Sequence, residues 1–361
     1  MWPYLLLFLL PAYRAVSNLR PQSLKVQAAP SASWPGWWWV MFGALVLMVG
    51  LRHEVGTDWG NYLGILNFAA DASFQEAMTR SDPAYMALNW LAVETGLGMY
   101  LVNTVCAALF AWGLVAFCRT QPRYWLALTV AMPYLITVVA MGYNRQGVAI
   151  GLAMLGLVAL GQRRILRFVL WLTLAAAFHK SALVLLPLAA LAGTERRVFT
   201  LLWLAVAGVL LYVLLLQEAV DRLTALYVDR ELASSGAAIR VAMNALPAAV
   251  FLLLRKRFHL EPAQRRFWTW MALGALAFVV LLKVSPSSTA IDRVALYWIP
   301  LQLFVWSRLP EALGGSIGAK AVWVYAVVAY SAAVLLVWLL FASNAKAWLP
   351  YQFYPWSLLG Y

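Results

Sequence analysis

The stretch "WPGWWWVMFGALVLMVG", residues 34–50, contains no charged side chain and decides the class of fold. It is followed directly by "LRHEVGTDWGNYLG", residues 51–64, which begins with a cluster of ionisable side chains. A transmembrane helix needs about 20 apolar residues to cross about 30 Å of hydrocarbon. The abrupt change from apolar to charged residues therefore predicts a membrane span that ends in water near residue 51.

The same composition extends over the whole chain. Its 361 residues are 64% hydrophobic and 11% charged, whereas soluble domains carry about 25% charged residues. The apolar runs lack the alternation that a transmembrane β-barrel requires. The sequence predicts an all-α polytopic integral membrane protein, with residues 1–361 as a single domain. We expect about 12 transmembrane or re-entrant helices, near residues 2–13, 35–51, 97–117, 124–141, 145–161, 166–178, 181–193, 198–216, 240–254, 267–283, 293–306 and 321–341.

The distribution of charge predicts the orientation of these helices. If the N-terminus is outside, the loops on one side hold 17 of the 27 Lys and Arg residues but only three of the 14 acidic ones. Basic residues collect in cytoplasmic loops, so this side is assigned to the cytoplasm. The net charge of +13 then needs no nucleic acid as a partner. Two long loops, residues 52–96 and 217–239, are expected on the outer side.

The segment 166–193 allows two interpretations. It is either one tilted span that buries His179 and Lys180 in mid-membrane, or two short helices that meet near His179. A lysine at the bilayer centre costs a few kcal/mol or more. A single span would also invert the positive-inside pattern downstream. We therefore expect two short helices, although each is about 18 Å long and needs a thinned bilayer or a re-entrant arrangement.

Three arginines, Arg145, Arg240 and Arg293, are predicted at the outer ends of helices, each near a helix N-terminus. Asn144 is expected to cap the first of these helices. A cation is disfavoured at a helix N-terminus and on the outer side of a membrane, unless an anion lies between the helices. Helix N-termini and arginines both bind phosphate. Alternatively, each arginine reaches for lipid headgroups, and Arg293 pairs with Asp292.

Other polar or aromatic residues fall at the same outer ends. Gln146 follows Arg145 in the first helical turn, and Asp58 and His179 are candidates for a general base. Trp59 and Tyr62 are candidates for stacking on a sugar. The alternatives are a solvated loop around Asp58 and a hydrogen-bonded helix end at His179.

Several motifs, taken in order, resemble the EpsG family of Wzy-like polymerases of bacterial surface polysaccharides. They are "EVGTDWGNY" (54–62), "NRQGVAIGLAM" (144–154), "AFHKSALVLLP" (177–187), the Ser-Gly pair before Arg240, and "DRVALYW" (292–298). The resemblance runs from about residue 50 to residue 300. It implies a GT-C-like helical fold and an enzyme of the bacterial inner membrane that acts at the outer face.

The resemblance also implies the substrate, which is an oligosaccharide repeat unit on undecaprenyl pyrophosphate. A growing glycan would be transferred from its lipid carrier to the sugar of another lipid-linked unit. Chain-length regulator and export proteins are the partners that such a polymerase would have, together with the lipid bilayer. No cofactor is expected.

The chemistry of this transfer fits the candidate residues. Pyrophosphate is a good leaving group, and arginines at helix N-termini stabilise its charge without a metal ion. Arg145, Arg240 and Arg293 are therefore assigned to pyrophosphate, with Asn144 and Gln146 beside them as substrate-binding residues. Either Asp58 or His179 would accept the proton of the acceptor hydroxyl.

Two other activities are compatible with the sequence. A flippase or transporter of lipid-linked oligosaccharide would place polar groups near the bilayer midplane, often on broken helices. A membrane O-acyltransferase would use His179 as its base and would need a path for an acyl donor from the cytoplasm.

Overall fold

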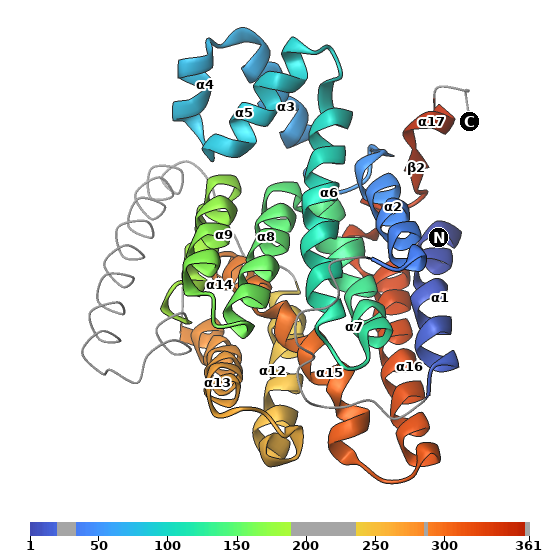
Figure 1. Cartoon of the computed structure of the whole chain (residues 1–361). Helices are drawn as coiled ribbons and strands as arrows, with labels where there is room; N and C mark the ends of the chain where they lie inside the picture. Colours follow the sequence, from blue (N-terminus) through green and yellow to red (C-terminus); the bar gives the residue numbers. More distant parts are fainter. Residues whose placement is uncertain (20–33, 189–235, 285–287, 358–361) are drawn as a thin grey trace, which may run out of the picture.

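The computed structural model describes residues 1–19, 34–188, 236–284 and 288–357, which form a bundle of helices (Figure 1). The elements of its first half are α1 (Trp2–Ser17), α2 (Gly36–Gly50), β1 (Arg52–His53), α3 (Trp59–Asp71), α4 (Phe74–Arg80), α5 (Pro83–Glu94), α6 (Gly98–Arg119), α7 (Tyr124–Ala131), the π-helix η1 (Met132–Ala140), α8 (Asn144–Gly161), α9 (Ile165–Phe178) and the 3₁₀ helix η2 (Lys180–Leu185). Those of its second half are α12 (Ala237–Leu254), η3 (Arg255–Phe258), α13 (Pro262–Val284), α14 (Ser288–Ala295), η4 (Leu296–Trp298), α15 (Ile299–Leu313), α16 (Ile317–Phe341), η5 (Ser343–Ala347), β2 (Gln352–Phe353) and α17 (Tyr354–Ser357).

Long apolar helices confirm the expected all-α membrane protein. Within the described residues, five helices are long and apolar enough to cross a membrane, namely α6, α8, α12 with η3, α13 and α16. The shorter α2, α7 with η1, and α9 are also apolar. Ten of the predicted spans coincide with helices. The span at 198–216 and the last five residues of that at 181–193 lie outside the described residues, so the number of 12 helices and the GT-C-like arrangement stay predictions.

Helices α6 and α8 form the centre of the bundle, and two glycines allow their backbones to pack closely. A Cβ atom at Gly113 would lie 1.8 Å from the carbonyl oxygen of Gly151, and one at Gly151 would lie 2.5 Å from the Cα of Phe110. Small residues let helix backbones approach each other in membranes. This contact fixes α8, whose N-terminal end carries several predicted site residues.

Residues 52–96, predicted as a long loop, are mostly helical. Helices α3, α4 and α5 form a small layer at the end of the bundle at the top of Figure 1, which we call the capped end. Ser73 and Glu76 form a capping box at the start of α4, a motif that satisfies two free backbone N–H groups. Gly60 lies inside α3, because one glycine lowers the stability of a helix by only about 1 kcal/mol. The solvated loop considered around Asp58 is therefore limited to the residues before α3.

The stretch after α2 is tied to the C-terminal segment. Strands β1 and β2 are antiparallel, with Arg52 opposite Phe353. The buried guanidinium of Arg52 donates to the carbonyl of Val55 at 3.3 Å and to that of Val49. Arg52 thus satisfies a carbonyl at the end of α2, which would otherwise be unsatisfied. The turn that follows, with Gly56 at φ 106°, leads the chain to Asp58.

The opposite end of the bundle carries the basic clusters that the sequence placed together. Helix α6 ends at Arg119, and α12 is followed by η3 with its run of basic residues. Here Arg123 donates to Glu311 at 2.7 Å, and Lys320 lies 2.6 Å from the same carboxylate. These pairs join α7, α15 and α16.

Candidate functional site

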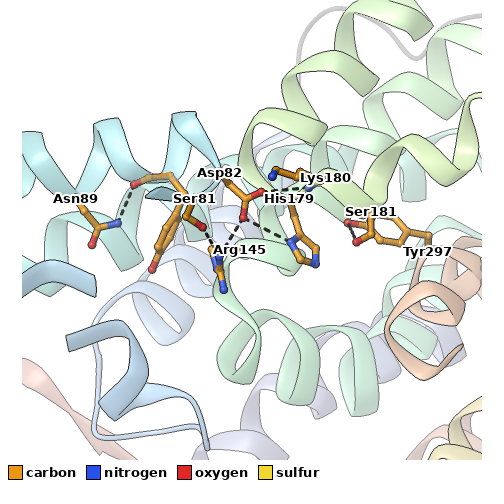
Figure 2. Close-up of polar contacts among 9 residues, drawn as sticks. Ser81, Asp82, Asn89, Arg145, His179, Lys180, Ser181 and Tyr297 are labelled. Atoms are coloured by element: carbon orange, nitrogen blue, oxygen red, sulfur yellow. Dashed lines mark hydrogen bonds and ion pairs between the residues drawn. The ribbon is translucent and has the colours of Figure 1, made fainter. Parts of the chain in front are cut away.

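Asp82 is a meeting point for three elements at the capped end (Figure 2). Its buried carboxylate accepts a hydrogen bond from Arg145 Nη1 at 3.0 Å and from the backbone N–H of Lys180 at 3.3 Å. The Nδ1 atom of His179 lies 3.7 Å away. Asp82 precedes α5, Arg145 is at the start of α8, and His179 follows α9. One carboxylate therefore brings together two predicted site residues that are 34 positions apart.

The helix break predicted at His179 is present. Helix α9 ends at Phe178, His179 has an extended backbone, and η2 begins at Lys180. The described part of the segment 166–193 therefore agrees with two short helices, and its last residues lie outside the described ones. Ser181 in η2 donates to the hydroxyl of Tyr297 at 3.4 Å, which links this break to η4.

Arg145 lies in the first turn of α8, as predicted. Its Nη1 also donates to the hydroxyl of Ser81 at 2.9 Å, and its side chain remains 27% exposed. The predicted cap of this helix was wrong. Asn144 is the first residue of α8, and its amide instead donates to Asn103 at 2.9 Å. The Asn144 side chain therefore binds the neighbouring helix α6 and does not cap the N–H groups of α8.

Gln146 and Arg293 connect α8 with α14. The Gln146 amide donates to the backbone carbonyl of Arg293 at 2.5 Å. The Arg293 side chain is exposed, and it forms no hydrogen bond or ion pair with any other residue in the described ranges. Its guanidinium is available to an anion at the capped end.

Arg240 is held differently. Its guanidinium binds Asp292 with two hydrogen bonds, from Nε at 2.5 Å and from Nη2 at 2.6 Å. The sequence suggested that Asp292 pairs with its neighbour Arg293, but the structure pairs Asp292 with Arg240 of α12. Parallel hydrogen bonds of this kind are strong and fix orientation. The carboxylate of Asp292 therefore balances much of the charge of Arg240, whereas Arg293 has no such partner among the described residues.

Asp58 lies just before α3, half-buried and within the electrostatic reach of two arginines. Burial raises the pKa of Asp58, and the positive charges of Arg293 and Arg145 oppose this shift, as does a hydrogen bond from Asn61. Desolvation disfavours the charged form of a carboxyl group. A carboxylate with a raised pKa is better suited to accept a proton near neutral pH than an ordinary surface aspartate.

Tyr143 connects the two groups of charges. It precedes α8 and is half-buried. Burial raises the pKa of Tyr143. The charges of Asp292 and Asp58 raise this pKa further, whereas those of Arg240 and Arg293 lower it. All four of these charged side chains therefore lie around one phenol at the N-terminal end of α8.

The two aromatic candidates for sugar stacking differ in exposure. Tyr62 is buried, with its ring centroid 5.9 Å from that of Tyr85, and burial raises its pKa to about 12. Trp59 is half-buried, and its ring centroid lies 5.9 Å from that of His53. A sugar can more readily reach Trp59, whereas Tyr62 is part of the packing beneath α5.

The arrangement combines an accessible arginine, a second half-exposed one, a carboxylate and an imidazole at one end of the bundle. Such a set can bind an anion and accept a proton beside it. Within the described residues, no group of three or more His, Cys, Asp or Glu side chains is placed to hold a metal ion.

Asp82 is the residue that sequence reasoning missed. It lies in "SDPAY", residues 81–85, which looks like an ordinary helix start because Pro is common at the first helical position. The one feature that could have indicated a site residue is the position of this Asp, next to Ser81 in the loop expected on the outer side. Its partners, however, come from the start of α8 and from the segment between α9 and η2, and no sequence spacing reveals such a contact.

Comparisons with known proteins agree with this picture. The model of the EpsG family matches residues 37–353. No curated protein and no solved structure matches the chain significantly. The matched range includes Asp58, Asp82, Arg145, His179 and Arg293, and it covers most of the chain. The protein therefore belongs to the EpsG family, a family of Wzy-like polymerases.

Proposed function

We propose that this protein is a polysaccharide polymerase that joins lipid-linked oligosaccharide units at the outer face of the bacterial inner membrane. The observation that carries the proposal is the gathering of Arg145, Arg293, Asp58 and His179 at the capped end of a membrane bundle of the EpsG family. The basic clusters at the opposite end support an outward-facing site, since positive residues favour the cytoplasmic side.

The proposed reaction is a glycosyl transfer. A hydroxyl oxygen of the acceptor sugar attacks the anomeric carbon of the growing glycan, while the bond from this carbon to the pyrophosphate oxygen breaks. Undecaprenyl pyrophosphate leaves with the electron pair, and Arg293 and Arg145 stabilise the negative charge that develops on it. The proton of the acceptor hydroxyl passes to Asp58 or to His179. The transfer needs no metal ion in this scheme.

The two arginines have complementary roles. Arg293 is exposed and makes no ion pair with a described residue, so it can follow the pyrophosphate as the substrate enters. Arg145 is held by Asp82 and Ser81, so its position is fixed before the substrate binds. Preorganised charge is most effective because it needs no rearrangement during the reaction. Arg240, already bound to Asp292, serves as a support for α14 and hence for Arg293.

A deletion strain of the native host tests the proposal. Loss of a polymerase leaves single lipid-linked repeat units at the outer face, whereas loss of a flippase leaves them at the inner face. We expect single units at the outer face, and restoration of polymer by the wild-type gene. Accumulation at the inner face would contradict the proposal and support a transporter.

Variants then test the site itself. Arg145→Ala is expected to lower polymer formation by about 10²-fold or more, because it removes a fixed positive charge from the transition state. Arg265→Ala is the matched control, an exposed arginine near the start of α13 at the opposite end. Wild-type polymer from an Arg145→Ala protein of normal abundance would rule out the phosphate role.

A further inference from the structure

Asp82 occupies a helix N-cap without acting as one. Aspartate at this position usually accepts a hydrogen bond from the second or third N–H group of its own helix. Asp82 forms no such bond with α5. Its carboxylate instead accepts from Arg145 and from the backbone of Lys180, at 3.0 and 3.3 Å. The needs of α5 therefore do not explain why an acidic residue lies here.

Because Asp82 is buried, its charge must be compensated by neighbouring residues. Asp82 is 4% exposed, and a buried carboxylate requires cations or donors around it. These come from Arg145 in the first turn of α8 and from the backbone of Lys180 at the start of η2. The third neighbour, His179 Nδ1, lies 3.7 Å away, which is longer than a hydrogen bond. Contacts of this type often shorten when substrate binds.

We propose that Asp82 is a positioning residue that sets the orientation of both the Arg145 guanidinium and the His179 imidazole. With Nδ1 facing Asp82, the Nε2 atom of His179 points away from this carboxylate and is left for the acceptor hydroxyl (Figure 2). When Nε2 accepts the hydroxyl proton, the Asp82 carboxylate balances the charge that forms on the ring. The inference rests on the proposed function, and it gives His179 the proton in that reaction.

The first test replaces the charge but keeps the shape. Asp82→Asn is compared with Asp71→Asn, an exposed residue at the end of α3. The assay uses purified protein and lipid-linked repeat units extracted from the deletion strain. For Asp82→Asn we expect kcat to fall about 10²-fold, the size of effect that follows a small misplacement of catalytic groups, with KM nearly unchanged. Asp71→Asn should behave as wild type. Wild-type kcat for Asp82→Asn, in an assay where His179→Ala is inactive, would overturn the inference.

A double-mutant cycle separates positioning from a general structural role. If Asp82 acts only through His179 and Arg145, Asp82→Asn should not slow the variant His179→Ala/Arg145→Ala any further, because these losses are not independent. A further loss of rate would show that Asp82 contributes without either residue, and the inference would fail. The cycles with His179→Ala alone and with Arg145→Ala alone measure the share that passes through each residue.

A spectroscopic test does not depend on activity. The chain has three histidines, so ¹⁵N-histidine NMR can assign His179 by loss of its signals in His179→Ala. We expect the proton of neutral His179 on Nδ1 in the wild type, and a change of this preference in Asp82→Asn. Unchanged signals would overturn the inference, whatever the activity. Should Asp82→Asn not accumulate in folded form, Asp82→Glu, which keeps the charge but moves it, provides the comparison.

The two proposals fail in different ways. If the NMR signals change as expected but Asp82→Asn, His179→Ala and Arg145→Ala all polymerise normally, Asp82 orients His179 and the proposed function of this site is wrong. If His179→Ala is inactive while Asp82→Asn is wild type in both assays, the proposed function stands and the positioning role of Asp82 is wrong.

Discussion

The two ends of the bundle both contain arginines bound to acidic side chains, but these arginines differ in their exposure. At the opposite end, Glu311 has two cationic partners, and its side chain is 2% exposed while that of Arg123 is 4% exposed. At the capped end, the side chain of Arg145 is 27% exposed and Arg293 is exposed. The ion pair of Arg123 with Glu311 is enclosed between helices, whereas Arg145 and Arg293 remain accessible.

The difference indicates which charges hold the protein together and which can meet a substrate. A buried ion pair that joins α7 to α15 contributes to the packing of these helices but cannot contact a lipid-linked sugar. An arginine that is partly exposed and positioned by a buried aspartate can do so. Experiments that remove charges from each end should therefore separate stability from catalysis.

The largest effect is expected from Glu311→Gln. It leaves the Arg123 guanidinium buried beside a neutral amide, and breaking a buried ion pair typically costs about 3–5 kcal/mol. We expect a sharp fall in abundance and in the temperature at which the purified protein unfolds. The folded fraction should keep its specific activity. Normal thermal stability of this variant would show that the pair does not hold the bundle.

Arg293→Ala is expected to have the reverse effect. Its side chain makes no ion pair with a described residue, so abundance and thermal unfolding should match the wild type. Polymer formation should fall about 10²-fold because a charge near the leaving group is lost. Measurement of kcat with extracted lipid-linked units decides this. A variant with normal kcat but poor folding would reverse the assignment of the two ends.

Asp58→Asn tests the pH dependence of the capped end. If Asp58 is the base, wild-type kcat/KM should fall as the pH drops through a pKa raised above the usual carboxyl range, and Asp58→Asn should lose this acid limb together with most of the rate. Because the folded pKa is raised, the wild type should also lose stability as pH rises through this window. Asp58→Asn should lack that loss. An acid limb that persists in Asp58→Asn would assign the proton to His179.

The smallest effect is expected from Trp59→Ala. Contacts between rings contribute about 0.5–1.5 kcal/mol, so we expect KM to rise by up to about tenfold with little change in kcat. Trp323→Ala in α16, an exposed tryptophan of a span, is the control and should leave KM unchanged. Equal effects of the two variants would indicate that Trp59 serves only the membrane interface.

The helices were predictable because apolar length is a local property, whereas their orientation in the membrane, inferred from the basic loops, stays a prediction. The break at His179 was found in the same way, from the cost of burying Lys180. The contacts of Asp82 and the exchange of partners at Asp292 were not, because each joins residues from helices far apart in the sequence. The cap at Asn144 failed for the same reason, since its partner Asn103 belongs to α6.

The tie between β1 and β2 has a consequence for biosynthesis. Gly56 donates to the carbonyl of Ala347 at 2.8 Å, and Tyr354 donates to that of Leu51 at 2.8 Å. The turn that carries Asp58 is thus fastened by residues that the ribosome adds about 300 positions later. Contacts of such sequence separation form late. The capped end is completed only after α16 has been inserted, so a partly made chain in the membrane lacks the finished candidate site.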